Sequence, residues 1–276
     1  MTILQYPGKK NSIAQWIISH FPHDYQSMTY LEPFFGSGSV FFRKERSAIE
    51  TINDLDNEIS NLFMQIRDNP DELILLLTNT PWSREEYDLS FERADNPIEQ
   101  ARRCIVRFWF TVGANVRKKN SMRFEVKRNT GALSYFHLKL PEVIAQASER
   151  LKHSKKNLVQ IENRNVLELI PVYNRENVLM YLDPPYLMET RTNKKVYRHE
   201  FSAEEHEELL KLITCSKARI IISGYESELY GKYLGGWRME QTTAKDQAGN
   251  RKIECIWMNY PDSQSSLFSQ GGGYAG

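Results

Sequence analysis

The chain has 276 residues, of which 41% are hydrophobic and 26% are charged, and its formal net charge is +1. These proportions are ordinary for a folded globular enzyme and exclude a disordered or fibrous chain. Apolar runs stay well short of the roughly 20 residues that a membrane-spanning helix needs, and residues 1–5 do not resemble the start of a secretory signal. We therefore expect a cytoplasmic protein with no membrane partner.

The first third of the chain alternates predicted helices and strands. The predicted elements are a helix over 13–20, a strand over 28–32, a small-residue turn over 34–39 opening a helix through Val40 and Phe41, a strand over 49–53, and a helix over 58–67. Asp54 follows the second strand directly. A strand, a glycine turn, a helix, a second strand and an acid in this order are typical of the first half of a nucleotide-binding α/β sheet.

Residues 69–154 break this alternation, and we predict that they form an inserted, mainly helical domain. Helices are expected over 71–77, 98–110 and 140–151. Residues 71–100 carry eight acidic and two basic side chains, whereas residues 101–128 carry nine basic and one acidic. The basic segment predicts a phosphate-binding surface, and a solvated helix face with internal ion pairs is the alternative.

Strands and helices alternate again after residue 154. The predictions are strands over 158–162, 178–182 and 219–223, helices from Val166 and over 203–214, and a final hairpin of 237–243 and 252–260. Residues 1–68 and 155–262 would then form one discontinuous α/β domain. Residues 263–276, rich in Ser, Gln and Gly, are expected to be a disordered tail.

Three scattered cysteines, Cys104, Cys215 and Cys255, give neither a disulfide framework nor a zinc-binding spacing. We expect each to be a buried thiol that packs as a small apolar group, and we expect no metal.

The segment Asp183-Pro184-Pro185-Tyr186 follows the apolar run over 178–182. Such a run indicates a strand buried on both faces, and open α/β sheets bind ligands at the carboxyl ends of their strands. Two prolines force an extended path, which would present the Asp183 carboxylate, the Pro184 carbonyl and the Tyr186 ring in one pocket. Two acceptors match the two N–H donors of an exocyclic amine, and a tyrosine ring can stack on a nucleobase. A simple tight turn is the alternative.

The turn Phe35-Gly36-Ser37-Gly38 allows a close approach of the backbone to a ligand. The third glycine of the dinucleotide-binding pattern is missing, because Phe41 follows Ser39 and Val40. Asp54 is placed to accept hydrogen bonds from ribose hydroxyls. The pattern favours a nucleoside-containing cofactor without a pyrophosphate.

Four segments occur in the order found in the Dam-type (D12 class, α-group) DNA adenine-N6 methyltransferases, which the chain resembles from Gln5 to about Tyr260. They are Tyr6-Pro7-Gly8-Lys9-Lys10, Glu32-Pro33-Phe34-Phe35-Gly36-Ser37-Gly38-Ser39-Val40-Phe41, Asp54 and Asp183-Pro184-Pro185-Tyr186. The resemblance implies the class I S-adenosylmethionine-dependent methyltransferase fold, a Rossmann-like mixed sheet with a C-terminal β-hairpin, and a target-recognition insertion over 69–154. The family usually has Gly-Gly-Lys and a tryptophan where this chain has Gly8-Lys9-Lys10 and Tyr6, which leaves open whether Lys9 or Lys10 takes the family's lysine position.

The resemblance also implies roles for individual residues. The implied catalytic residues are Asp183, Pro184, Pro185 and Tyr186. The residues implied to bind S-adenosylmethionine are Tyr6, Lys10, Glu32, Pro33, Phe34, Phe35, Gly36, Ser37, Gly38, Asp54, Asn163, Arg164 and Asp183. The residues implied to contact DNA are Lys9, Arg107, Asn115, Arg117, Lys118, Lys119, Arg123, Lys127, Arg128 and Tyr197. The segment Tyr197-Arg198-His199-Glu200-Phe201 matches a stretch beside the target base, and Arg251-Lys252-Ile253-Glu254 matches the opening of the last strand.

The expected reaction is methyl transfer from S-adenosylmethionine, which becomes S-adenosylhomocysteine, to an adenine flipped out of double-stranded DNA. The target would be GATC or a related short site, read by a bacterial or phage monomer with or without a cognate restriction endonuclease. Cytosine-N4 methylation is the nearest alternative, although its families more often have serine at the position of Asp183. A non-catalytic DNA-binding module and a nicotinamide-dependent oxidoreductase are further alternatives, disfavoured by the intact motif and the missing glycine.

Overall fold

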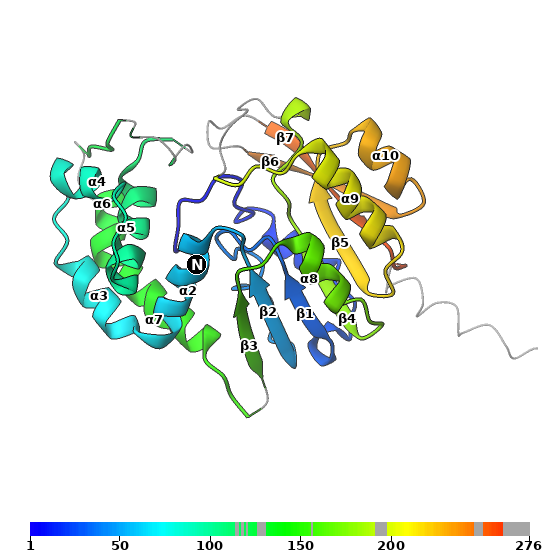
Figure 1. The fold of residues 1–276 in the computed structure, drawn as a ribbon, viewed down its shortest axis with the longest axis horizontal. Helices are drawn as coiled ribbons and strands as arrows, with labels where there is room; N and C mark the ends of the chain where they lie inside the picture. The colour runs from blue at the N-terminus through cyan, green and yellow to red at the C-terminus, as the bar shows by residue number, and fades with distance from the viewer. Residues whose placement is uncertain are drawn as a thin grey trace, which may run out of the picture.

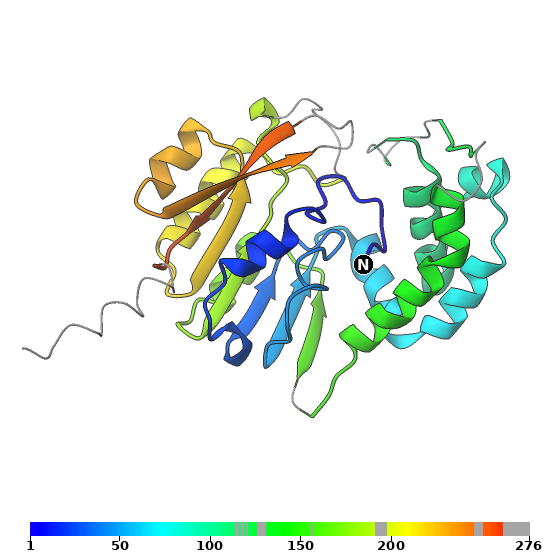
Figure 2. The same ribbon diagram turned by 180° about the vertical axis from the view of Figure 1, so that it is seen from behind.

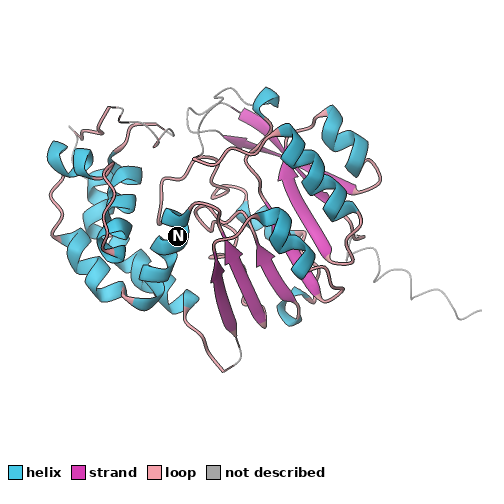
Figure 3. Cartoon of the chain, in the orientation of Figure 1, coloured by secondary structure: helices cyan, strands magenta, loops and turns pink. Residues whose placement is uncertain are grey.

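A mixed seven-stranded sheet organises the part of the chain that the computed structural model describes, residues 1–113, 116, 119, 121–125, 131–155, 157–190, 198–245 and 251–261 (Figures 1 and 3). The strands are β1 (Thr29–Glu32), β2 (Ile49–Asn53), β3 (Leu158–Glu162), β4 (Val178–Leu182), β5 (Arg219–Gly224), β6 (Arg238–Lys245) and β7 (Arg251–Met258). Their order is β3-β2-β1-β4-β5-β7-β6; the first five run parallel and β7 runs antiparallel to both of its neighbours. The sheet confirms the predicted Rossmann-like fold with its C-terminal hairpin.

Alternate side chains of the central strands enter two separate hydrophobic clusters. In β4, Leu179 and Tyr181 face one cluster, whereas Val178, Met180 and Leu182 face the other. Strands buried on both faces are continuously apolar, which is why β4 has no charged residue and its one hydroxyl, on Tyr181, is hydrogen-bonded to Ser223. Helices α8 (Val166–Val172), α9 (Ala203–Thr214) and α10 (Glu228–Leu234) cover the face toward the viewer in Figure 1.

The opposite face packs against α1 (Ala14–Ser19) and α2 (Asn57–Asp68), and Figure 2 shows α1 in front of the sheet. Local sequence sets where the longer helices begin. Asp56 caps α2 by accepting a hydrogen bond from the backbone N–H of Glu58, and Ser202 and Glu205 form a reciprocal capping box at the start of α9. Two short 3₁₀ segments, η1 (Tyr25–Ser27) and η2 (Met188–Thr190), complete the connections around the sheet.

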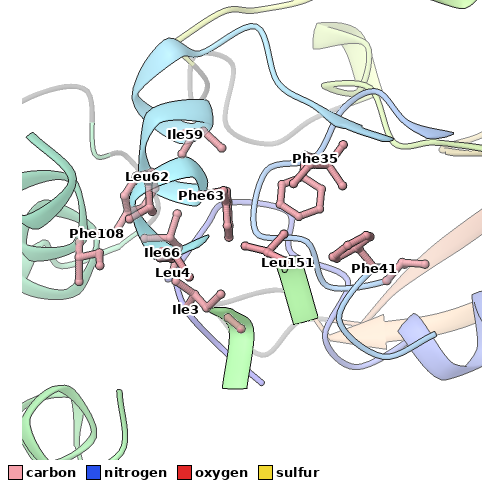
Figure 4. Close-up of a cluster of buried hydrophobic side chains, with 14 of the residues drawn as sticks. Ile3, Leu4, Phe35, Phe41, Ile59, Leu62, Phe63, Ile66, Phe108 and Leu151 are labelled. Carbon is pink, nitrogen blue, oxygen red and sulfur yellow. The ribbon is translucent and has the colours of Figure 1, made fainter. Parts of the chain in front are cut away.

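The insertion forms a helical group beside the sheet (Figure 1). Its helices are α3 (Pro70–Thr78), α4 (Arg84–Leu89), α5 (Pro97–Phe110), α6 (Ala132–Leu138) and α7 (Leu140–Leu151). Figure 4 shows the buried contact between the two parts, in which α2, α5, α7, the N-terminal segment and the turn after β1 each contribute apolar side chains. A single hydrophobic cluster therefore spans the insertion and the sheet, with α2 shared between them.

A buried ionic network also joins the insertion to the sheet. Glu50 of β2 is fully buried; Lys44 donates to one of its carboxylate oxygens at 2.5 Å, and Arg150 of α7 donates to both. Arg150 also lies over the Phe41 ring, 3.9 Å from its centroid. A buried carboxylate needs such partners, because desolvation without them is costly.

Some sequence-based predictions are wrong. Residues 39–43 form successive turns rather than the helix expected through Val40 and Phe41, because Gly36 and Gly38 take left-handed φ values of 50° and 65° and only isolated helical hydrogen bonds follow. Helices α4, α6 and α10 were not predicted. Cys215 is exposed, whereas Cys104 and Cys255 are buried as expected. The predicted tail over 263–276 lies outside the described residues.

None of the helices in the described part of the chain combines the length and the apolarity that crossing a membrane requires.

Candidate active site

The carboxyl ends of β1, β2, β3 and β4 surround one pocket. Its empty space is about 950 Å³, counted with the mouth that opens to solvent. Loops that follow these strands line it together with residues 6–10 of the N-terminal segment and residues 198–201. This is where parallel sheets place their ligands, because every loop at this edge leaves a strand in the same direction.

Asp183 lies at the end of β4 on the wall of this pocket. The chain leaves the sheet after Leu182, and residues 183–187 have no regular secondary structure. The Asp183 Oδ1 atom forms an ion pair with Lys10 Nζ at 3.0 Å, and about 19% of its side chain remains exposed. Burial raises the pKa of Asp183, and the Lys10 ammonium opposes that rise.

Tyr186 does not line this pocket. Its side chain is buried behind Asp183, and its hydroxyl donates to Glu254 Oε2 at 2.6 Å. Lys10 Nζ lies 4.6 Å from the centroid of its ring, and Tyr225 packs edge-on against the ring at 4.6 Å. Burial beside Glu254 and Asp183 holds the pKa of Tyr186 well above its usual value, so the hydroxyl stays protonated and donates.

The Pro185 carbonyl is held by a buried histidine. His206 of α9 is fully buried; its Nε2 atom lies 2.9 Å from the Pro185 carbonyl oxygen, and its Nδ1 atom lies 3.2 Å from the Tyr230 hydroxyl. A carbonyl can only accept, so Nε2 carries the proton, and Nδ1 of the neutral ring then accepts from Tyr230. The hydrogen bond from His206 of α9 thus holds the backbone of Pro184 and Pro185 in place.

Asp54 projects from the end of β2 toward the turn after β1. Its Oδ2 atom accepts from the Gly36 N–H at 2.8 Å and its Oδ1 atom from the Asp56 N–H at 2.9 Å. Burial raises its pKa to about 7, and the two backbone donors oppose the rise. Asn163 supports this loop from outside the pocket by donating to the carbonyls of Asp54 and Leu55.

Glu32 is a second buried acid, at the end of β1. It accepts from the Tyr30 hydroxyl at 2.7 Å, and burial raises its pKa to about 8. Three of the acids that line the pocket, Glu32, Asp54 and Asp183, therefore have pKa values that are raised mainly by burial. Clustered acids with raised pKa values inside a cleft are typical of functional sites.

Glycine is required in the turn after β1. Gly36 and Gly38 both have left-handed φ values, and a Cβ at Gly38 would lie 2.5 Å from Phe35 Cζ and 2.7 Å from Phe42 Cε2. A Cβ at Gly36 would lie 2.8 Å from Tyr6 Cε1. The turn packs so closely on its aromatic neighbours that a side chain would collide with them.

The structure brings most of the predicted cofactor residues together around this pocket. Those that line it are Tyr6, Lys10, Glu32, Pro33, Phe34, Phe35, Gly36, Ser37, Asp54, Arg164 and Asp183. Gly38 and Asn163 do not line it; both support the loops that do. Pocket residues that were not predicted to bind cofactor include Leu55, Asp56, Asn165, Val166, Arg198 and Phe201. Asn165 and Val166 follow β3 as Asp54 follows β2, so the strand-end rule alone could have identified them.

Arg107 requires a correction, because it is not on the surface as a DNA-contacting residue would be. Its guanidinium is buried, where it donates to the Ser90 carbonyl at 3.1 Å and pairs with Glu58 of α2. Arg198 reaches Glu58 from the other side at 2.9 Å. Arg107 thus attaches α5 to α2, and its charge is already compensated within the protein.

The other predicted DNA contacts lie partly within the described residues. Lys119 is exposed and pairs with Asp88 at 2.9 Å, and Arg123 donates to the Thr111 carbonyl. Lys9 lines the pocket, and its pKa is lowered by burial and by the nearby charges of Arg123 and Arg43. These cations repel one another, as expected where an anion would bind. The remaining predicted contacts fall outside the described residues: Asn115, Arg117, Lys118, Lys127, Arg128 and Tyr197.

Comparison with known proteins relates the chain to one family. The family model described as D12 class N6 adenine-specific DNA methyltransferase matches residues 6–235. The type II methyltransferase M1.LlaDCHI of Lactococcus lactis subsp. cremoris is 27% identical over 283 aligned positions, which cover 93% of this chain and 94% of that protein. Among solved structures, the rRNA methyltransferase AviRa of Streptomyces viridochromogenes is 12% identical, and the match covers 89% of this chain and 81% of that chain with a TM-score of 0.37.

Proposed function

Because the chain belongs to the family of D12 class N6 adenine-specific DNA methyltransferases, we propose that it binds S-adenosylmethionine in the strand-end pocket and methylates an adenine flipped out of duplex DNA. The enzyme's activity is N6-adenine methylation of DNA. The observation that carries the proposal is the convergence of Asp183, Lys10, Asp54 and Glu32 on one pocket.

The residues of the pocket fit the chemistry of this cofactor. Asp54 accepts from two backbone N–H groups and keeps further lone pairs for the two hydroxyls of a ribose. Glu32 offers a carboxylate to the ammonium of a methionine moiety. Leu55, Val166 and Phe201 would supply apolar surface for the adenine ring, and Leu55 is 48% exposed. When bound, S-adenosylmethionine supplies a methyl group on a positively charged sulfur.

Asp183 would act on the target amine. Its carboxylate and the Pro184 carbonyl are two acceptors, so together they can orient both N–H groups of N6 and aim the nitrogen lone pair at the methyl group. As the N6–methyl bond forms, the amine must lose a proton, and the nearby carboxylate can take it. Tyr186 would face the flipped base with its ring. For the amine to bind Asp183, the Lys10 ammonium must move away from the Asp183 carboxylate.

The insertion would hold the DNA. We propose that Lys9, Lys119 and Arg123 bind phosphates at the side of the pocket that faces the insertion, and that Asn115, Arg117, Lys118, Lys127, Arg128 and Tyr197 add further contacts. Arg107 is no longer included, since its guanidinium is buried and paired. A few polar side chains of residues 69–154 would read base edges within GATC or a related short site. We propose that the enzyme acts as a monomer beside a cognate restriction endonuclease; the description of the relative as a type II methyltransferase supports the endonuclease partner.

The test of this proposal is incubation with unmethylated DNA and tritiated S-adenosylmethionine, followed by nucleoside analysis. We expect label in N6-methyladenine, and single-molecule sequencing of DNA from expressing cells would identify the site. Label in N4-methylcytosine, or no label, would contradict the proposal.

Asp183→Ala provides the matching test of the catalytic residue. It should abolish transfer while S-adenosylmethionine still binds, because it removes the acceptor for the target amine but leaves Asp54 and Glu32 in place. Full activity of this variant would refute the role of Asp183.

A further inference from the structure

Three side chains of the active site converge on one carboxylate outside the catalytic motif. Glu254 of β7 accepts from the Tyr186 hydroxyl at 2.6 Å through Oε2 and from the Tyr225 hydroxyl at 3.4 Å through Oε1. Its Oε2 atom also lies 3.8 Å from Lys10 Nζ. Glu254 is only 9% exposed. A carboxylate this buried is stable only where donors surround it, and these donors are the groups that border Asp183.

The direction of β7 explains how a residue so distant in sequence reaches the site. Because β7 runs antiparallel to β5, its N-terminal half lies at the edge of the sheet where β4 and β5 end. Side chains alternate along the strand, so Glu254 shares a face with Ile256 and Met258, which belong to the cluster on the α1 side. Ile253 points to the other face and is 59% exposed. Packing alone would bury the isoleucine and expose the glutamate, and here the glutamate is buried and the isoleucine is exposed.

Lys10 lies between two carboxylates. Its ammonium is 3.0 Å from Asp183 Oδ1 and 3.8 Å from Glu254 Oε2, and it lies over the Tyr186 ring. An amine donating to Asp183 would replace the ammonium there. Glu254 then offers Lys10 a second acceptor within a short movement, so neither charge becomes buried and unpaired.

We propose that Glu254 is a positioning residue for methyl transfer: it fixes the Tyr186 ring through its hydroxyl and retains Lys10 when the target amine occupies Asp183. This inference rests on the proposed function. Glu254 touches neither the cofactor pocket nor Asp183 directly, so it acts through Tyr186 and Lys10. Its loss should slow the chemical step and leave binding of the cofactor intact.

The first experiment compares Glu254→Ala and Glu254→Gln with matched controls at Glu240, a glutamate of β6 that lies opposite Ile256 in the same hairpin. We expect Glu254→Ala to lower kcat about 10- to 100-fold, the loss expected for a hydrogen bond to a charged group. Glu254→Gln keeps an acceptor for Tyr186 but no charge for Lys10, and it should fall between Glu254→Ala and the wild type. Glu240→Ala and Glu240→Gln should keep the wild-type kcat.

Two readouts separate positioning from general structural damage. The dissociation constant of S-adenosylmethionine and the melting temperature of Glu254→Gln should stay near the wild-type values while kcat falls. If cofactor affinity and melting temperature fall together with kcat, Glu254 has only a structural role and the inference is overturned.

A double-mutant cycle with Tyr186→Phe tests the route of the effect. Tyr186→Phe keeps the ring and removes the hydroxyl that Glu254 holds. If Glu254 acts through that hydroxyl, Glu254→Ala should reduce kcat by a smaller factor in the Tyr186→Phe background than in the wild type. Equal factors in both backgrounds would overturn the inference. Absence of N6-methyladenine with the wild-type enzyme would refute the proposed function itself, whereas an active wild type with an unaffected Glu254→Ala refutes this inference alone.

Discussion

Asp54 combines burial with two backbone donors, and this combination makes its charge sensitive to pH near neutrality. Burial favours the neutral acid and raises the pKa to about 7. Hydrogen bonds from ribose hydroxyls favour the ionised form instead. In the proposed role of Asp54, binding of a ribose would therefore compete with protonation of the same group.

We predict that adenosine, which carries a ribose but no amino-acid moiety, binds more weakly as the pH falls below about 7. Only the ionised carboxylate accepts from both hydroxyls, so the dissociation constant should rise by up to about tenfold per pH unit below the pKa of Asp54. Calorimetric titration between pH 5.5 and 8 measures it. The Asp54→Asn variant should bind weakly with no such dependence, and an affinity of the wild type that is constant over this range would contradict the role given to Asp54.

At the scale of the element, the turn after β1 forms part of the pocket wall. Two of its glycines take left-handed backbone conformations that other residues avoid. Gly36 has a positive φ and donates its N–H to Asp54, and Gly38, also with a positive φ, lies close against Phe35 and Phe42. The aromatic side chains then fill the interior on which the turn rests.

We predict that Gly38→Ala lowers the free energy of unfolding by about 2–4 kcal/mol, from left-handed strain together with the clash against Phe35 and Phe42. Gly113→Ala is the matched control. Gly113 has a φ of 83° but nothing within 4 Å of its would-be Cβ, so only strain of about 1 kcal/mol should appear. Urea denaturation of both variants measures the difference, and equal losses would show that the aromatic contacts impose no steric demand.

At the scale of the whole molecule, the insertion and the sheet are joined by apolar contacts around α2 and by two buried ionic connections. Arg150 connects α7 to Glu50 of β2, and Arg107 connects α5 to Glu58 of α2. The position of the basic segment relative to the pocket depends on these connections, and the proposed function requires DNA to contact both parts at once.

We predict that Arg150→Met lowers the free energy of unfolding by about 3 kcal/mol, because Glu50 would remain buried with Lys44 as its remaining charged partner. Lys152→Ala, two residues further along the chain, is the control. Lys152 pairs with Glu149 at the surface, with side chains 48% and 74% exposed, and its loss should produce almost no change. Thermal or urea unfolding measures the free energy of unfolding of both variants. An Arg150→Met protein as stable as the wild type would mean that the ionic network around Glu50 makes no net contribution to stability.

DNA binding is also a property of the whole molecule. We predict that Lys119→Gln combined with Arg123→Gln weakens DNA binding and reduces the slope of log K against log salt concentration by about 1–2, as expected if one or two phosphate contacts are lost. Lys232→Gln, on α10 at the other end of the molecule in Figure 1, should leave the slope unchanged. Fluorescence anisotropy at several salt concentrations measures both slopes. An unchanged slope in the double variant would mean that Lys119 and Arg123 are ordinary solvated surface residues that do not contact phosphates.

The amino-acid sequence alone determined the strands and most of the helices, because apolar periodicity, capping residues and glycine turns are local signals. It placed Asp183 and Asp54 correctly at the ends of β4 and β2 for the same reason. It could not show that Arg107 is buried against Glu58, or that Glu254 receives the Tyr186 hydroxyl from 68 residues away. Those pairings depend on which strand lies beside which and on where α2 packs. Such choices are made by long-range burial of apolar surface and by the need of buried charges for partners, and no local pattern records them.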